Sequence, residues 1–397
     1  MIKRKLFYIS ILTIAIAACN KVLPKAPAEE NVLDGPIEGL TGAEQRQFLA
    51  GDVAFNDDVF TASTGLGPVF VATSCGTCHA GDGKGHPFTT LTRFGQTDST
   101  GNKFLDRGGP QLQHRALPGY YNEELPIGAT HSSFTPPANT GLGFLDAVAD
   151  ETIVALSDPL DNNGDGISGI PNWTNIPGYV SVRPGAIERN EKYISRFGKK
   201  GAAYDLLQQT ATAYNQDIGI TSSFEPRDTY SGMLIEPEVT DKTIHDVVFY
   251  LKTLKAPKQR NVDDRDVKRG KELFIQVNCS GCHIPQLQTG LSPIAALSNK
   301  TIFPYTDLLL HDMGPGLDDG YTEGTALTSE WRTPPLWGLG LSKNSQGGSY
   351  FLLHDGRAKN IEEAISLHGG EGQNSRNNFQ LLNDSEKQQV IKFLESL

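Results

Sequence analysis

Apolar residues recur at helical spacing in four stretches of the chain, two in each half. The stretches begin near residues 40, 240, 264 and 383. Their apolar positions are Phe48, Phe55, Val59 and Phe60, then Ile244, Val247, Val248, Leu251 and Leu254, then Val267, Gly270, Phe274 and Val277, and finally Val390, Ile391, Leu394 and Leu397. The repeated order predicts two helical units, each with an opening and a closing helix.

Polar residues with capping ability precede three of these helices. Their side-chain oxygens can accept hydrogen bonds from the first backbone amides of a helix. The candidates are Thr240 or Asp241, Asp264 or Asp266, and Asn383 with Glu386 as a capping box. Between the two units, Ala256 to Asp263 lacks helical spacing and predicts a linker.

Each unit also contains the pattern Cys-x-x-Cys-His, at Cys75 to His79 and at Cys279 to His283. Two thiols one helical turn apart can bond to the two vinyl groups of haem, and the adjacent imidazole can ligate its iron. A four-cysteine zinc site or vicinal disulfides would leave both histidines unexplained. We therefore expect two covalently bound haem c groups. Their expected protein ligands are Cys75, Cys78, His79, Cys279, Cys282 and His283.

These features predict a mostly α fold of two cytochrome-c-like helical domains packed together, at residues 41–256 and 257–397. The first domain is too long for a bare cytochrome. Its excess, roughly residues 88–227, is rich in glycine, proline and asparagine and predicts long loop insertions over one haem. A hydrophobic content of 38% and a charged content of 20% are ordinary for a soluble globular chain.

The N-terminus has the features of an export signal. A basic region at Lys3 to Lys5 precedes a short apolar run, and Ile16 to Cys19 resembles a bacterial lipobox. We expect residues 1–18 to be a lipoprotein signal peptide, Cys19 to carry lipid, and residues 19–40 to form a tether. The protein would then be exported and anchored by lipid at the periplasmic face of a bacterial membrane. A plain cleaved signal and an uncleaved anchor are the alternatives.

The sixth iron ligands decide between electron transfer and reaction with a small molecule. For the second haem, Ile361, Ile365 and His368 share one face of a predicted short helix, so His368 is the expected ligand. Met313 is the rival, because thioether ligation is common in cytochromes c. A hydrogen-bonded core histidine is the other interpretation of His368.

The first haem has no equivalent helix with a histidine. His86 and His114 lie in polar surroundings rich in glycine and proline, where a surface position is the favoured interpretation. An open axial position on this haem is therefore expected. Peroxide cleavage would need a nearby acid–base group, and the candidates are Gln111, Glu123 and Glu124, although acidic loop residues are mostly just solvated.

Two further features carry weaker signals. Asp161, Asn163 and Asp165 match the first half of a calcium-binding loop, but the twelfth position is Asn172 rather than glutamate. The stretch is either a calcium site completed from elsewhere or an Asx-rich turn. Trp331 and Trp337 flank the run from Arg332 to Pro335. Core packing is the favoured role of the two tryptophans, and the alternative is that one of them is an electron relay between the haems, with Arg332 on a haem propionate.

Taken together, the motifs resemble the bacterial di-haem oxidoreductases labelled peroxidase or thiol oxidoreductase, relatives of the di-haem cytochrome c peroxidases. The resemblance spans residues 40–397. The runs that carry it are Cys75 to His79, Asp165 to Gly169, Arg196 to Gly198, Asp217 to Ser222, Cys279 to His283, Tyr305 to Gly314, Trp331 to Gly338 and His354 to Arg357.

The resemblance implies that the N-terminal haem reacts with peroxide and that the C-terminal haem passes electrons to it. It also implies calcium near the haem interface. The position of His368 holds a methionine in the peroxidases and a tyrosine in the enzyme that matures a tryptophylquinone cofactor, and it is an iron ligand in both. The distal residues of the peroxidases do not align securely with Gln111, Glu123 or Glu124.

We thus expect an enzyme that reduces hydrogen peroxide with electrons from a small donor such as a cytochrome c or a cupredoxin. The formal net charge of −11 argues against nucleic acid as a partner and is compatible with steering a basic donor. A pure electron-transfer protein and a haem-dependent oxidase or oxygenase of an organic or protein substrate are the alternatives. The sequence leaves open whether a homodimer forms.

Overall fold

The computed structural model describes residues 28–397. Leu33–Leu397 forms one compact unit, and a short 3-10 helix at Glu29–Asn31 lies outside it. The predicted signal peptide and Cys19 fall outside the described residues. Within the described part of the chain, no helix is both long enough and apolar enough to cross a membrane.

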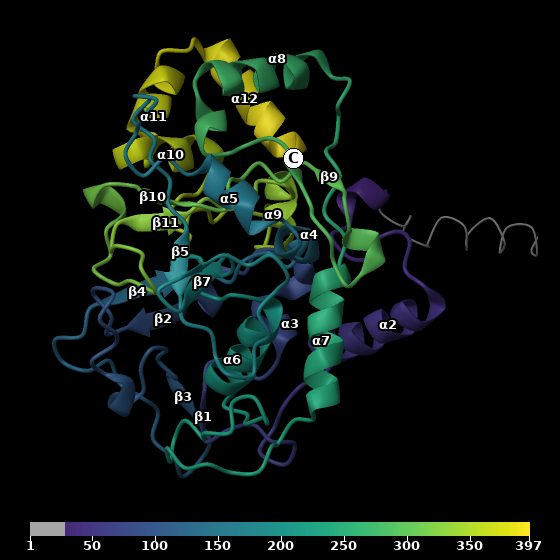
Figure 1. The fold of residues 1–397 in the computed structure, drawn as a ribbon, viewed down its shortest axis with the longest axis vertical. Coiled ribbons are helices and arrows are strands. Elements are labelled where there is room, and N and C mark those ends of the chain that lie inside the picture. Colours follow the sequence, from purple (N-terminus) through teal and green to yellow (C-terminus); the bar gives the residue numbers. More distant parts are fainter. Residues whose placement is uncertain (1–27) are drawn as a thin grey trace, which may run out of the picture. The chain divides into compact units, whose positions relative to one another are not determined.

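Two pairs of packed helices organise the unit. In the N-terminal half α2 (Gly42–Asn56) packs against α7 (Asp241–Thr253), and in the C-terminal half α8 (Arg265–Gln276) packs against α12 (Asp384–Ser396). Figure 1 shows α8 and α12 together at one end of the unit and α2 beside α7 away from it. These are the four helices that the apolar spacing predicts.

A glycine lies at the closest approach in each pair. A Cβ atom at Gly51 would overlap the carbonyl of Asp246 on α7, and a Cβ atom at Gly270 would overlap the carbonyl of Gln389 on α12. The residue four positions further along each partner helix, Tyr250 or Phe393, also lies against the glycine. The two pairs therefore share one mode of contact.

The helix starts follow the capping residues. Thr240 caps α7, Asp264 caps α8, and Asn383 with Glu386 forms the predicted capping box of α12. The first helix is shorter than its apolar spacing suggests, because α2 ends at Asn56. Asparagine and two aspartates follow one another there, and such side chains compete for backbone hydrogen bonds, so Val59 and Phe60 lie beyond the helix.

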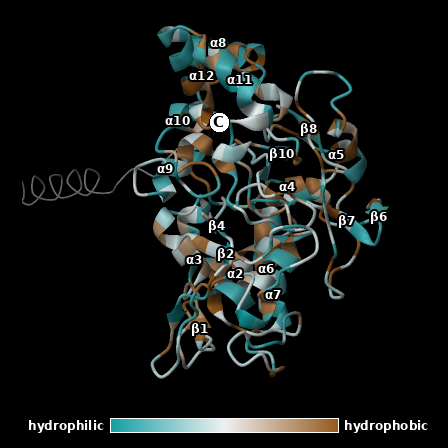
Figure 2. Ribbon diagram, turned by 90° about the vertical axis from the view of Figure 1, so that its left-hand side faces the viewer, coloured by the Kyte–Doolittle hydropathy of each residue, from teal (hydrophilic) through white to brown (hydrophobic). Residues whose placement is uncertain are grey.

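The insertion at residues 88–227 contains more regular structure than loops alone. Its main element is α6 (Leu206–Ile218), which Asp205 caps and Gly219 ends in the left-handed conformation. Helix α4 (Leu142–Asp146) packs against α7 and is among the more hydrophobic elements in Figure 2. The insertion therefore adds to the core as well as covering it.

The other helices are short, and the strands pair only in small antiparallel sheets. The helices are α3 (Cys75–Cys78), α5 (Asp150–Leu156), α9 (Ser342–Ser345), α10 (Ile361–Ser366) and α11 (Gln373–Gln380). The strand pairs are β1 (Val69–Phe70) with β3 (Arg115–Ala116), β2 (Leu91–Phe94) with β4 (His131–Phe134), β8 (Leu287–Gln288) with β9 (Thr301–Ile302) and β10 (Leu310–Asp312) with β11 (Glu330–Arg332). One three-stranded sheet orders β5 (Asn172–Thr174), β7 (Lys192–Ser195) and β6 (Glu188–Arg189).

Helix exceeds strand, at 34% against 12%, so the predicted fold class is confirmed only in this coarse sense. Much of the unit is loop, because the insertions outweigh the helical framework. The two larger apolar clusters of the described residues lie around α2, α6 and α7 and around α8, α10 and α12, and a small third one contains Trp331. The cytochrome-c-like two-domain arrangement and its boundary at residues 256–257 stay predictions.

Replacing Gly270 by valine should lower the free energy of unfolding by about 3 kcal/mol, because the new side chain must separate α8 from α12. Guanidinium unfolding followed by circular dichroism measures the change. Gly178 faces open space, so Gly178→Ala is the matched control and should stay within about 0.5 kcal/mol of wild type. Equal effects of the two substitutions would contradict the close helix contact.

Candidate functional site

Both Cys-x-x-Cys-His motifs fold as single tight turns. In the first, α3 carries Cys75 and Cys78, and the Ser74 hydroxyl caps it by accepting the Thr77 amide at 3.2 Å. In the second, a 3-10 turn at Cys279–Gly281 follows Asn278, which has a positive φ of 64°. Each turn thus holds its two thiols close together, directly before the histidine.

The two motif histidines are oriented in the same way. His79 Nδ1 lies 2.9 Å from the carbonyl oxygen of Pro137, and His283 Nδ1 lies 3.0 Å from that of Tyr305. A carbonyl can only accept, so Nδ1 carries the proton and Nε2 keeps its lone pair, as in metal-ligating histidines. Burial lowers the pKa of both imidazoles to about 4, which keeps them in the neutral form that binds metal.

An aromatic residue of the opening helix supports each histidine. Phe55 of α2 contacts both Tyr250 of α7 and the His79 ring, with centroid distances of 5.5 and 5.9 Å. Phe274 of α8 contacts Phe393 of α12 at 5.3 Å and the His283 ring at 6.5 Å. Each helix pair is therefore connected to its histidine through one phenyl ring.

His368 follows α10 and repeats the pattern of the motif histidines. Its Nδ1 donates to the carbonyl of Ala364 at 2.7 Å. A positive charge on His368 would lower the pKa of His283, which means that the two imidazoles are near one another. Met313 is a neighbour of His368, since a Cβ atom at Gly372 would touch both side chains within 3.4 Å. Both predicted candidates for the sixth ligand thus lie in the same place.

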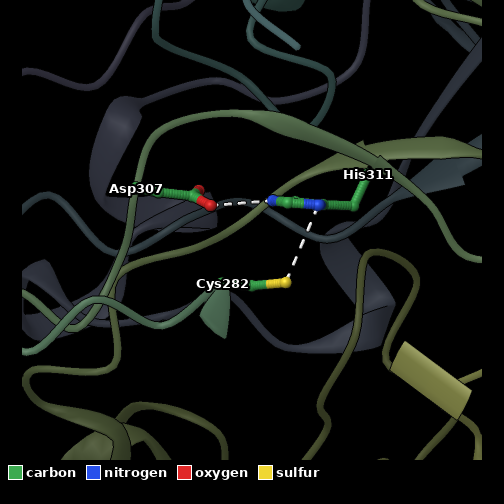
Figure 3. A group of neighbouring side chains, drawn as sticks. All are labelled: Cys282, Asp307 and His311. Atoms are coloured by element: carbon green, nitrogen blue, oxygen red, sulfur yellow. Dashed lines mark hydrogen bonds and ion pairs between the residues drawn. The ribbon is translucent and has the colours of Figure 1, made fainter. Parts of the chain in front are cut away.

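The four described cysteines are free thiols. Burial raises the pKa of Cys75, Cys78 and Cys279 to about 12 and raises that of Cys282 as well, so all four are neutral. Within residues 28–397 they do not gather into one four-cysteine cluster. The group of ligand-type side chains found there is Cys282 with Asp307 and His311 (Figure 3).

His311 is held between two carboxylates. Its Nε2 lies 2.8 Å from Asp307 and its Nδ1 lies 2.6 Å from Glu371, while the Cys282 sulfur lies 3.7 Å from Nδ1. Burial opposes protonation, but these hydrogen bonds raise the pKa of His311 well above its ordinary value. The imidazolium is a fixed positive charge beside the second motif, because both of its nitrogens donate to carboxylates.

The predicted acid–base residues are in different environments. Gln111 is buried, whereas Glu124 is exposed. Glu123 accepts the Gln113 amide at 2.6 Å, and burial raises the pKa of its carboxyl to about 7. Gln111 is the residue that connects to the first motif, because its amide donates to Asp217.

Asp217 is the acidic group beside the first motif. Its charge raises the pKa of both Cys75 and Cys78, after the larger effect of burial, so it is close to both thiols. Its backbone carbonyl accepts the Val71 and Ala72 amides at 2.7 and 3.0 Å, a few residues before Cys75. Burial raises the pKa of the Asp217 carboxyl to about 6.

Arg93 completes this polar group. Its guanidinium donates to Gln111 at 3.3 Å and pairs with Glu323 at 2.5 Å. Sequence reasoning missed Arg93 as well as Asp217. The start of the run Asp217 to Ser222 was the available signal, because a polar residue precedes a short apolar stretch there.

The remaining predicted ligands lie elsewhere. His86 Nδ1 accepts the Phe88 amide at 3.2 Å, and its ring packs between those of Phe88 and Phe351. His114 is exposed. Both placements fit the interpretation of these histidines as residues without a role at iron.

The Asp161 loop is an Asx-rich turn in which side-chain oxygens accept backbone amides. Asp161 accepts from Gly166 at 3.1 Å, Asn163 from Asp165 at 2.9 Å and Asp165 from Ile167 at 2.9 Å. Calcium binding there stays a prediction. Glu371 also accepts the amides of Ser168 and Gly169, so the loop is tied to the surroundings of His311.

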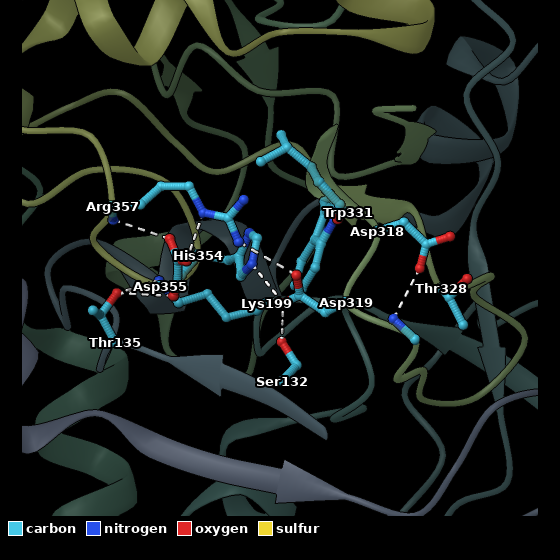
Figure 4. Close-up of polar contacts among 12 residues, drawn as sticks. Ser132, Thr135, Lys199, Asp318, Asp319, Thr328, Trp331, His354, Asp355 and Arg357 are labelled. Atoms are coloured by element: carbon cyan, nitrogen blue, oxygen red, sulfur yellow. Dashed lines mark hydrogen bonds and ion pairs between the residues drawn. The ribbon is translucent and has the colours of Figure 1, made fainter. Parts of the chain in front are cut away.

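Trp331 lies between the two halves of the chain in a stack with His354. The two rings, which Figure 4 shows, have centroids 3.6 Å apart and an angle of 8° between their planes. The Lys200 ammonium lies 3.8 Å from the indole centroid. The indole nitrogen donates to the carbonyl of Leu317 at 2.8 Å. Trp331 is buried and belongs to an apolar cluster, so core packing is one of its roles.

Comparison with known families identifies the family of the chain. Residues 120–397 match the family described as "Di-haem oxidoreductase, putative peroxidase", which is more than two thirds of the chain. The chain belongs to this family. The matched residues include Asp217, the second motif and His368, whereas the first motif precedes them.

Other comparisons add little to this assignment. No curated protein matches the chain. A solved structure of hydrazine synthase from Kuenenia stuttgartiensis is similar at 13% identity and a TM-score of 0.37, over 95% of this chain and 98% of that one. At that TM-score the likeness carries no argument about function.

The side chains of this di-haem oxidoreductase fit the haem cofactors that its family implies. Each motif provides two neutral thiols and an imidazole whose Nε2 is available to a metal, and His368 provides a third such imidazole near His283. Haem c needs thiols that can bond to its two vinyl groups and an imidazole nitrogen that can ligate its iron, and both motifs have them.

Replacing His368 by alanine should convert the C-terminal haem from low spin to high spin, because the second axial imidazole is removed. Electron paramagnetic resonance of the ferric protein measures this change. The adjacent Met313→Ala is the matched variant and should leave the low-spin signal in place. The opposite outcome, with loss of the signal only in Met313→Ala, would assign the methionine as ligand.

Proposed function

We propose that this di-haem oxidoreductase reduces hydrogen peroxide at a covalently bound haem held by Cys75, Cys78 and His79. Electrons would enter through a second haem held by Cys279, Cys282 and His283, with His368 as its other axial ligand. The observation that carries the proposal is the unequal supply of ligands to the two motifs.

The histidines and methionines of the described chain support this inequality. His368 and Met313 both lie near His283. Met233 is exposed. The histidines outside these positions and the two motifs are exposed or hydrogen-bonded elsewhere, and they are His86, His114, His131, His245, His311 and His354. A free axial position at the His79 haem follows from this distribution.

A haem with a free axial position supplies an iron that binds peroxide and electrons that cleave its O–O bond. Complete reduction of one peroxide to two waters also consumes two protons, so the protein must deliver protons near the first motif. Asp217 suits this role better than Glu123 or Glu124, because it lies close to both thiols of that motif.

The surroundings of Asp217 support a proton-transfer role. A carboxyl with a pKa of about 6 can both take and give a proton near neutral pH. The Gln111 amide fixes its orientation, and Arg93 holds Gln111 in turn. The ion pair between Arg93 and Glu323 keeps that arginine in place.

The donor, the location and the calcium site form part of the same proposal. A small donor such as a cytochrome c or a cupredoxin suits an acidic protein with a net charge of −11. Export and lipid attachment at Cys19 would bring the protein to such donors at the periplasmic face of a membrane. Calcium at Asp161, Asn163 and Asp165 would act close to Glu371 and therefore to the second haem.

Purified protein should carry about two covalent haems per chain by pyridine haemochrome assay, and its half-reduced form should oxidise a reduced cytochrome c on addition of peroxide. Electron paramagnetic resonance should show one high-spin haem in that form. Two low-spin haems with no spectral response to peroxide or cyanide would identify a pure electron carrier. Turnover of an organic substrate without a cytochrome donor would identify an oxidase.

Asp217→Asn should lower kcat/KM for peroxide by about 10²- to 10⁴-fold, the usual contribution of an acid–base group. Because the pKa of Asp217 is raised to about 6, wild-type activity should rise with pH through that value as the carboxylate forms, and the variant should lose this rise. Steady-state kinetics between pH 5 and 8 measures both effects. Glu191→Gln, at an exposed position, is the control and should keep the wild-type profile.

A further inference from the structure

Lys200 is fully buried and satisfied by three carbonyl oxygens. Three further cationic side chains are partly buried and form no ion pair among the described residues. They are Lys84, which follows the first motif, Lys199, which precedes α6, and Arg332 at the end of β11. The ion pairs found within 4.0 Å among the described residues all involve cations other than these three. Buried lysine and arginine without a partner are rare in proteins, because desolvation of the charge is costly.

Neutral oxygens are the acceptors of these three groups. Lys84 Nζ donates to the Leu353 carbonyl at 3.1 Å, and Lys199 Nζ donates to the Thr135 hydroxyl at 3.3 Å. Figure 4 shows Lys199 reaching towards Thr135. These contacts leave donor capacity on both ammonium groups, since each has three N–H bonds.

Arg332 is bound in the same way. Its Nε donates to the Gly198 carbonyl and its Nη1 to the Thr333 carbonyl, both at 3.0 Å. The guanidinium has five N–H donors, so three are left for a further acceptor.

The nearest acids are already engaged. Asp355 faces both lysines, but it binds Arg357 at 2.6 Å, and Asp307 faces Arg332 but binds His311 at 2.8 Å. Burial lowers the pKa of Lys84 to about 7 and that of Arg332 to about 10. It lowers that of Lys199 well below its ordinary value, with further lowering by the other two cations. Lys199 is therefore close enough to both Lys84 and Arg332 to feel their positive charges.

Hydrogen bonds connect this cationic group to the first motif. Thr135, which accepts from Lys199, is two residues from Pro137, whose carbonyl holds His79. Lys84 is adjacent to Gly85, whose amide donates to the Pro136 carbonyl at 2.9 Å. Lys199 and the neighbour of Lys84 thus contact the segment, residues 135–137, whose last carbonyl orients His79.

A similar path leads from the cationic group to the second motif. The Arg332 amide donates to the Lys199 carbonyl at 3.1 Å. Thr306 donates to the Thr333 carbonyl at 2.6 Å, and the neighbouring Tyr305 carbonyl holds His283. Short chains of hydrogen bonds and neighbouring residues therefore lead from the cations to both histidines. An anionic ligand would offset the charge of this cationic group.

We propose that Lys84 and Lys199, together with Arg332, bind the propionate carboxylates of the haem attached at Cys75 and Cys78. A haem carries two such carboxylates, and lysine and arginine are the side chains that bind carboxylates most strongly. The inference rests on the proposed haem attachment. It goes beyond it by assigning the side chains that set the charge around that haem.

A positive charge near a haem favours its reduced form, because reduction adds one negative charge. Lys199→Gln should therefore shift the ferric–ferrous equilibrium of the N-terminal haem at least tenfold towards ferric. For a one-electron couple this corresponds to a fall in midpoint potential of about 59 mV. Lys199→Arg keeps the charge and should keep the potential.

Spectroelectrochemical titration of both haems measures these potentials, with haem content determined by pyridine haemochrome assay on the same samples. Lys84→Gln is the second variant and should move the same potential in the same direction. Lys103→Gln removes an exposed lysine and is the matched control. The potential of the C-terminal haem should change less than that of the N-terminal haem in the two lysine variants.

Three outcomes would overturn the inference while leaving haem attachment intact. They are unchanged potentials in Lys199→Gln and Lys84→Gln, equal shifts in Lys199→Gln and Lys199→Arg, and a wild-type potential that responds to added inorganic phosphate through these lysines. The last would assign them to a diffusible anion. Absence of covalent haem from the wild type would instead refute the proposed function.

Discussion

Two helix contacts without intervening side chains determine where both motif histidines lie. At Gly51 and at Gly270 a partner carbonyl occupies the space of a Cβ atom, so each opening helix approaches its closing helix as closely as backbones allow. The phenyl rings of Phe55 and Phe274 then contact both the closing helix and the histidine. A change in either helix distance would reach the motif imidazole through one ring.

The same low-dielectric interior produces different charge states because the partners differ. Imidazoles that meet a single carbonyl, such as His79, are neutral, whereas His311 is positive between two carboxylates. Asp217 forms no ion pair, and burial outweighs the opposing effects of Gln111 and Arg93, so the pKa of its carboxyl is raised to about 6. The charge pattern of the site therefore follows from which buried groups have an ionic partner.

Local sequence was sufficient for the features that depend on neighbours in the chain. The motif turns, the caps at Asp264 and Asn383, and the orientation of His368 after α10 all follow from residues within a few positions of one another.

The rest depends on contacts across long separations, which spacing does not encode. Asp217 meets Gln111 across about a hundred residues, and Lys199 meets Arg332 across more than that. Glu123 and Glu124 are adjacent in sequence, yet only Glu123 is partly buried. Tertiary contacts, which composition does not reveal, decide which side of a loop is buried. The cap and the terminal glycine of α6 are present in the sequence, but the glycine-rich composition of the surrounding insertion led to a prediction of loops.

The pairing of β10 with β11 has a consequence for evolution of the chain. Leu310 lies opposite Arg332 and His311 opposite Trp331, and successive strand residues point to opposite faces. A slip by one residue would exchange the indole and the guanidinium, removing the stack on His354 and placing a cation in its position. Insertions and deletions are thus tolerated far less in this short ribbon than in the long loops around it. The fold tolerates only changes that keep each side chain on its own face of the ribbon.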